Sequence, residues 1–70
     1  MTNRLVVHLP GSCYNFDSDD LDKLTTLSSF CKKELNAYHA SENIDELTVD
    51  TLSPEKSDKF HSLILELNFD

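Results

Sequence analysis

The sequence is poor in the residues that most ligand-binding and catalytic motifs require. It contains one glycine, Gly11, two cysteines and no tryptophan among 70 residues. A single glycine excludes the glycine-rich loops that hold phosphate groups in nucleotide-binding proteins. No apolar run is long enough to span a bilayer, and the run at residues 5–7 is too short for the apolar core of a signal peptide. We therefore expect a cytoplasmic protein that has no nucleotide cofactor and no membrane segment.

Basic residues are also scarce, and this shapes the expected partners. Thirteen acids stand against six lysines and arginines, which gives a formal net charge of −7. Such a negative field repels nucleic acids and anionic membranes. We expect no direct binding to either. The acidity favours a partner with a basic protein surface, or it serves solubility alone.

The chain also lacks the spacings that mark metal sites and nucleophiles. His8, His39 and His61 have no second histidine four residues away and no CxxC nearby. Cys13 next to His8 or His39 would still need a third orienting group and a pocket to act as a nucleophile. Acids alternate at residues 17–22 as in a calcium loop, but that loop's glycine and its final glutamate are missing. We predict a non-enzymatic protein with no metal and no cofactor.

The clearest pattern that is present indicates a long amphipathic helix between residues 16 and 38. We expect it to run from about Ser18 to about His39, with Asp17 as N-cap and Asp20 completing a capping box. Phe30 lies off its apolar face. Cys13 and Cys31 are expected to be reduced thiols, although a disulfide between them stays open. The apolar face recurs at three- and four-residue steps: Leu21, Leu24, Leu27, Cys31, Leu35 and Tyr38.

Two further segments alternate between apolar and polar residues and are predicted to be strands. They are residues 4–9, which end at the turn signal Pro10-Gly11, and residues 46–52. Residues 12–16 between the turn and the helix are expected to form a loop. The segment 60–69 matches the strand and the helix templates equally well, and we choose the strand.

These elements predict one α+β domain over residues 1–70. The fold would be β-α-β-β, with a fully antiparallel three-stranded sheet in the order 1-3-2 and one long helix on one face. The alternative has a second helix at about residues 54–67, which gives β-α-β-α. In the first arrangement Val6, Phe60 and Ile64 would lie on the uncovered face of the sheet and could join two copies of the chain or bind a partner.

Small size, acidity, few cysteines and the absence of enzyme motifs resemble the small inhibitors made by phages and other mobile elements. These include anti-CRISPR and anti-restriction proteins, several of which mimic DNA; the resemblance rests on size and charge and transfers no residues. It implies a stoichiometric inhibitor that blocks a basic, nucleic-acid-handling surface of a larger protein. The alternative is a homodimeric structural or regulatory module. The acids expected to bind a partner are Asp19, Asp20, Asp22, Glu42, Asp45, Glu46 and Asp50.

Overall fold

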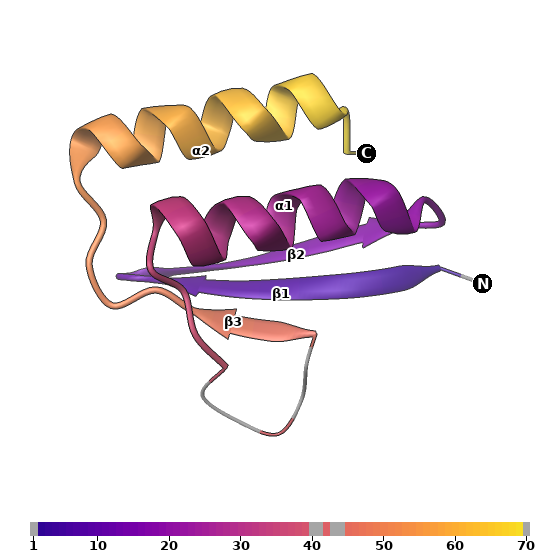
Figure 1. The fold of residues 1–70 in the computed structure, drawn as a ribbon, viewed down its shortest axis with the longest axis horizontal. Helices are drawn as coiled ribbons and strands as arrows, with labels where there is room; N and C mark the ends of the chain where they lie inside the picture. Colours follow the sequence, from indigo (N-terminus) through magenta and orange to yellow (C-terminus); the bar gives the residue numbers. More distant parts are fainter. Residues whose placement is uncertain (1, 40–41, 43–44, 70) are drawn as a thin grey trace.

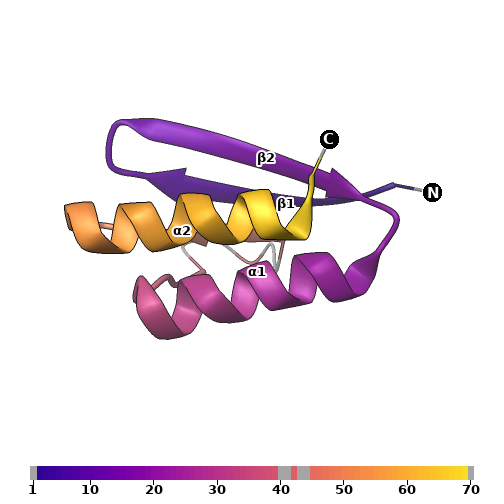
Figure 2. The same cartoon turned by 90° about the horizontal axis from the view of Figure 1, so that it is seen from above.

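The chain folds into a three-stranded sheet with two helices on one of its faces (Figures 1 and 2). The computed structural model describes residues 2–39, 42 and 45–69. The helices lie side by side and run in opposite directions, and no described helix or strand covers the sheet's other face. The elements are β1 (Asn3–Leu9), β2 (Ser12–Ser18), α1 (Leu21–Glu34), β3 (Glu46–Thr48) and α2 (Pro54–Leu67).

The first two strands form a hairpin, of which only the first strand was predicted. β1 agrees with the strand expected at residues 4–9, and Pro10-Gly11 turns the chain, with Gly11 in the left-handed region at a φ of 76°. The loop expected at residues 12–16 is wrong. β2 occupies this segment and pairs antiparallel with all seven residues of β1. Tyr14 and Phe16 alternate with polar neighbours, and Phe16 is buried against the helices.

The third strand lies on the other side of β1 and runs parallel to it. The amide of Val6 donates to the carbonyl of Asp45 at 2.8 Å, and the amide of Val49 donates to the carbonyl of His8 at 2.8 Å. The expectation of a fully antiparallel sheet is therefore wrong. β2 ends where β1 begins, and α1 carries the chain back along the sheet. β3 then begins opposite Val6, the fourth residue of β1, and runs in the direction of β1.

Most of the segment at residues 60–69, expected to be a strand, belongs to α2, so the second helix of the alternative is confirmed, whereas its order β-α-β-α is wrong because β2 makes the order β-β-α-β-α. Ser53 caps this helix by accepting a hydrogen bond from the amide of Lys56 at 3.2 Å, and Pro54 follows at the first position. Asn68, with a φ of 58°, ends it. The predicted strand order 1-3-2 matches the pattern of the observed order β2-β1-β3, because each joins one pair of strands that are consecutive in the chain and one pair that are not. The consecutive pair was expected to be the last two strands, but it is β1 and β2.

The single long helix is replaced by two helices of 14 residues each. α1 stops at Glu34, and Asn36 adopts the left-handed conformation with a φ of 55°, which ends the helix before Tyr38. The apolar face is largely confirmed, because its central members are buried, whereas Leu21 is 61% exposed and Tyr38 is 44% exposed. Phe30 is partly buried and packs against the core. The buried members of the face are Leu24, Leu27, Cys31 and Leu35.

The core lies between the helices and the inner face of the sheet. Val7 of β1, Leu27 of α1 and Leu47 of β3 are fully buried at its centre. α2 completes it over β2, where the Phe60 ring lies 6.0 Å from the ring of Tyr14 and 6.1 Å from that of Phe16, measured between centroids. Apolar contacts therefore hold both helices against one face of the sheet.

Candidate functional site

Several of the predicted partner-binding acids gather at one end of the molecule. At this end β1 begins, β2 ends, α1 begins and α2 ends (Figure 1). Asp19 lies in the connection between β2 and α1, Asp20 caps α1, and Asp22 lies in its first turn. Asp17, the last but one residue of β2, lies at the same end, and Asp45, directly before β3, lies beside Leu5 in the half of β1 nearer to this end. We call these five carboxylates the acidic end.

Local sequence explains the first part of the acidic end. Asp20 has an extended backbone, and its side chain accepts a hydrogen bond from the amide of Asp22 at 3.0 Å. The hydroxyl of Ser18 accepts from the amide of Asp20 at 3.0 Å and tightens the turn out of β2. The N-cap predicted at Asp17 is therefore wrong by three residues. Asp20 therefore caps α1, whereas Asp19 and Asp22 are exposed charges that do not cap the helix.

Asp17 is held by Arg4 across the β1–β2 pair. The Nε of Arg4 lies 2.7 Å from Oδ1 of Asp17, and Nη2 lies 3.1 Å from Oδ2, so the contact is bidentate. The hydrogen bond from Arg4 lowers the pKa of Asp17 below its ordinary value, and the carboxylate raises the pKa of Arg4. Arg4 therefore neutralises one of the five charges at the acidic end.

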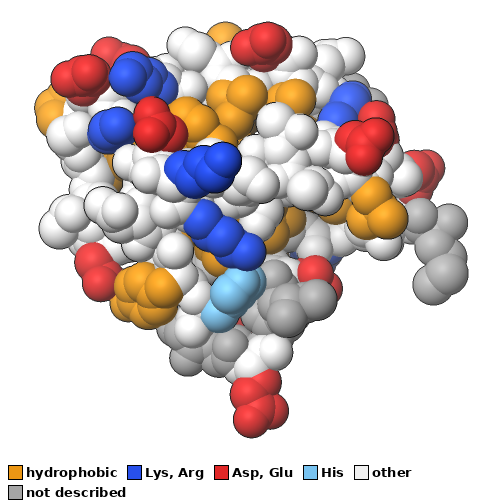
Figure 3. All heavy atoms as spheres, viewed as in Figure 1, with side chains coloured by type: hydrophobic (Ala, Val, Ile, Leu, Met, Phe, Trp, Pro, Cys, Tyr) orange, Lys and Arg blue, Asp and Glu red, His pale blue; other side chains and the backbone are white. Residues whose placement is uncertain are grey.

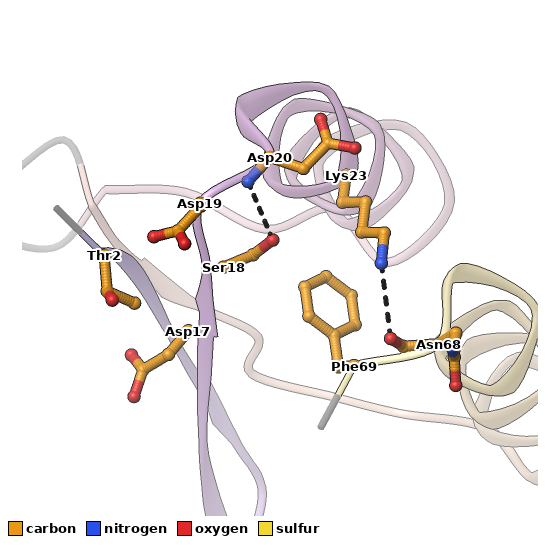
Figure 4. A pocket seen from close by; sticks show the side chains of 8 residues that line it. All are labelled: Thr2, Asp17, Ser18, Asp19, Asp20, Lys23, Asn68 and Phe69. Carbon is orange, nitrogen blue, oxygen red and sulfur yellow. Dashed lines mark hydrogen bonds between the residues drawn. The ribbon is translucent and has the colours of Figure 1, made fainter.

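Carboxylates also line a surface hollow of about 350 Å³ between β2 and the two helices (Figure 4). Lys23 crosses its upper side, where Nζ donates to the carbonyl of Asn68 at 3.3 Å and lies 6.0 Å from the centre of the Phe69 ring. In this view the side chains of Asp17 and Asp19 point away from Lys23. The hollow thus joins an aromatic face to exposed carboxylates, which is an environment that suits a cationic side chain. Its lining is Thr2, Asp17, Ser18, Asp19, Asp20, Lys23, Asn68 and Phe69.

A second hollow of about 350 Å³ brings Asp45 to the same end. It lies between β1 and the start of α1, and Thr2 lines both hollows. Asp45 reaches this position because its carbonyl accepts the hydrogen bond from Val6 that begins the β1–β3 pairing. Leu21, which is exposed, contributes an apolar surface beside it. Acids from residues 17–22 and residue 45 are therefore joined by the fold.

The other predicted acids lie elsewhere. Glu46 is on the open face of the sheet, where its Oε1 lies 2.5 Å from Nε2 of His8. Asp50 is near the far end of β1 and accepts a hydrogen bond from the hydroxyl of Tyr38 at 2.8 Å, which raises the pKa of Tyr38. Glu42 is exposed in the connection between α1 and β3. The structure therefore divides the predicted set into an acidic end and three separate positions.

The three residues of the predicted apolar patch do not share a face. Val6 is half-buried on the open face of the sheet. Phe60 is fully buried in the core, and Ile64 packs against the core from α2. The patch was derived from a strand at residues 60–69, and the helix there places two of its members under the covered face of the sheet.

The far end of the molecule has balanced charges. The end of α1 and the start of α2 meet there, and Nζ of Lys56 lies 3.5 Å from Oε1 of Glu34. On the viewed face most basic side chains lie at the upper left and centre, with acids among those at the upper left, and one further basic side chain lies at the upper right beside acids (Figure 3). Four lysines, Lys32, Lys33, Lys56 and Lys59, accompany four acids, Glu34, Asp50, Glu55 and Asp58. The negative field is therefore concentrated away from this end.

The cysteines and the described histidines form neither a metal site nor part of the two hollows. Cys13 is exposed and lies opposite His8 in the β1–β2 register, and neither residue lines the two hollows. Cys31 is buried on the other side of the sheet, and burial raises the pKa of its thiol to about 12. Both cysteines are free. Within residues 2–39, 42 and 45–69, no cluster of three histidine, cysteine or acidic residues is arranged to hold a metal ion.

Sequence reasoning missed the basic and aromatic members of the acidic end. Arg4 lies in the strand predicted at residues 4–9, and its pairing with Asp17 depends on a hairpin that was not predicted. Lys23 lies in the predicted helix, and its contact with Phe69 depends on α2. The alternation of Tyr14 and Phe16 with polar residues was the available signal for the hairpin.

Comparison with protein-family models, curated proteins and solved structures gave no match to this chain. Neither helix in the described part of the chain is both long and apolar enough to cross a membrane. The function of the chain is therefore inferred from the geometry and the charge of its surface.

Proposed function

We propose that this chain is a small non-enzymatic binding protein whose acidic end docks on a basic surface of a larger protein. The observation that supports the proposal is the grouping of Asp17, Asp19, Asp20, Asp22 and Asp45 at one end, opposite an end whose lysines and acids balance. A field with this asymmetry attracts a lysine- and arginine-rich surface and orients the molecule as it approaches. The bound chain would then block that surface sterically and electrostatically.

The partner class that fits is a protein that handles nucleic acid. Such proteins hold phosphate groups in grooves lined with lysine and arginine, and fixed carboxylates compete for the same groups. Asp19 and Asp22 are the central residues of this proposal, because no other described side chain pairs with their carboxylates. The chain would then act as a stoichiometric inhibitor by nucleic-acid mimicry, of the anti-CRISPR type that phages and mobile elements make.

The proposal is tested by removing charge from the acidic end while keeping the fold. In the test variant Asp19, Asp20 and Asp22 are replaced by asparagine, which also caps helices well, so α1 should form normally. The matched control carries Glu34→Gln, Glu55→Gln and Asp58→Asn, which removes the same amount of charge at the far end, from the end of α1 and the start of α2. Circular dichroism and thermal unfolding establish that both variants remain folded.

Each immobilised variant is incubated with a lysate of the cells that produce the protein, and bound material is eluted with a salt gradient. We expect a nucleic-acid-binding protein to elute from the natural chain as salt rises, to be retained by the control and to be lost from the test variant. Added duplex DNA or RNA should displace it. Binding that resists salt, or that survives the three asparagines unchanged, would show that the acidic end is not the docking surface.

A further inference from the structure

The two edges of the sheet differ in how they are protected. The β3 edge is three residues long, and Tyr38 covers it through two backbone hydrogen bonds with Thr48, at 3.0 and 2.8 Å. The β2 edge is seven residues long, and in the described part of the chain no other segment pairs with its outer side. Long unpaired edges are templates for pairing with another strand.

The register identifies the backbone groups that are unpaired on β2. Val6 and His8 direct their backbone groups towards β3. Because these directions alternate along a strand, Leu5 and Val7 direct theirs towards β2. Their antiparallel partners Phe16 and Tyr14 direct theirs back towards β1. The outward N–H and C=O groups of β2 therefore belong to Cys13, Asn15 and Asp17, and no hydrogen bond to another described residue occupies them.

The side chains along this edge do not oppose pairing. Proteins commonly protect an open edge with lysine, proline or a bulge, and residues 12–18 contain neither lysine nor proline. The only charge is that of Asp17, and Arg4 of the same chain pairs with it through two hydrogen bonds. All seven residues are in regular register with β1, so the edge is also free of bulges.

We propose that a second copy of this chain covers the edge, by antiparallel pairing of β2 with the partner's β2 about a two-fold axis at Asn15. In this register Asn15 lies opposite the partner's Asn15, and Cys13 lies opposite the partner's Asp17. All outward backbone groups of one strand meet outward groups of the other, and no like charges are directly opposed. The three-stranded sheets join into one continuous sheet of six strands, which is an isologous interface.

A second feature on the same side of the molecule supports a copy of this chain as the occupant. The ring of His61 lies 6.2 Å from the ring of Tyr14, so this side of α2 faces β2. Leu65, one turn further along α2, is 81% exposed. When two β2 strands pair, the two α2 helices flank the junction on one face of the joined sheet, and each Leu65 faces the partner's helix. Tyr14 would then lie opposite the partner's Phe16, an aromatic cross-strand pair.

The first test is the oligomeric state of Asn15→Pro, with Asn15→Thr as the matched control. Proline removes the outward N–H of residue 15, and it leaves the β1 ladder intact because that N–H takes no part in it. We expect the natural chain and Asn15→Thr to approach twice the 8.0 kDa monomer mass as concentration rises in sedimentation or light scattering, and Asn15→Pro to remain a monomer. A natural chain that stays monomeric at high micromolar concentration, or an Asn15→Pro variant that dimerises equally, overturns the proposal.

Cross-linking provides a second test that does not depend on how Asn15→Pro folds. A hydrogen-bonded antiparallel pair has a Cα separation of about 5.5 Å, which a disulfide can span. In a Cys13→Ser background, Asn15→Cys should give a disulfide-linked dimer on mild oxidation, whereas Thr25→Cys, exposed on α1, should not. If the two variants cross-link equally, the two-fold axis is not at residue 15. Both tests use the chain alone, so their outcome is separate from that of the partner-binding experiment.

Discussion

Substitution of Phe60 tests the largest difference between the expected and the observed fold. Phe60 is fully buried beneath α2, against the rings of Tyr14 and Phe16. Replacing a buried phenylalanine with alanine costs about 3–5 kcal/mol, because apolar contacts are lost and a cavity remains. A chain of 70 residues has a free energy of unfolding of about 3.5–10 kcal/mol in total. Phe60→Ala should therefore remove a large share of the stability and lower Tm by more than about 12 °C.

Leu65→Ala is the matched control, since it truncates an apolar residue of the same helix. Leu65 is 81% exposed, and alanine favours helices at least as well as leucine, so its free energy of unfolding should change by less than about 0.5 kcal/mol. Had residues 60–69 formed a strand, Leu65 would belong to the buried face. Urea unfolding followed by circular dichroism, at a concentration at which the chain is monomeric, measures both variants. A costly Leu65→Ala together with a mild Phe60→Ala would refute the packing of α2.

Two further predictions concern titratable groups. Burial of Cys31 raises the pKa of its thiol to about 12, so a thiol reagent such as dithionitrobenzoate should modify one cysteine in the folded protein, the exposed Cys13, and two after denaturation. The hydrogen bond from Arg4 lowers the pKa of Asp17 in the folded state, so this carboxylate favours folding above its unfolded pKa and the contribution is lost as the pH falls through the folded value. Arg4→Ala should raise the pKa of Asp17 towards 3.8 in an NMR titration, whereas Lys32→Ala, at the far end, should leave it unchanged.

The sequence predicted those elements whose signals are local. β1 was predicted from its alternation, and the buried face of α1 was predicted from its period. The hairpin was missed because residues 12–16 were interpreted as a loop, although the alternation of Tyr14 and Phe16 with polar residues also indicates a strand. For residues 60–69 the periodicity could not decide between helix and strand. Ser53 and Pro54 at the helix start carried the deciding information, because capping and a fixed proline φ act before any packing forms.

The acidic end was predictable only in part, for a similar reason. Asp19, Asp20 and Asp22 are neighbours in the sequence, so their proximity needs no tertiary structure. Asp45 joins them because β3 pairs in parallel with β1, and Asp50 is carried to the other end by the same strand. The predicted antiparallel order 1-3-2 already made the strands at residues 4–9 and 46–52 run in the same direction, but without a hairpin the helix would begin where the first strand ends. β2 returns the chain to the start of β1 before α1 begins, so the missed hairpin changes the end at which Asp19, Asp20 and Asp22 lie.

The central strand β1 relates the two proposed surfaces to each other. Its residues that face β3 bring Asp45 to the acidic end, and its residues that face β2 determine which groups of β2 point outward. Asp17 belongs to both surfaces, and Arg4 of β1 neutralises it, so the edge can pair without a buried charge. Because the proposed pairing is antiparallel, it places the acidic ends of the two copies at opposite ends of the junction. The copies would not repel each other there, and both acidic ends would remain open to a basic partner, so the dimer and the proposed docking function are compatible in one molecule.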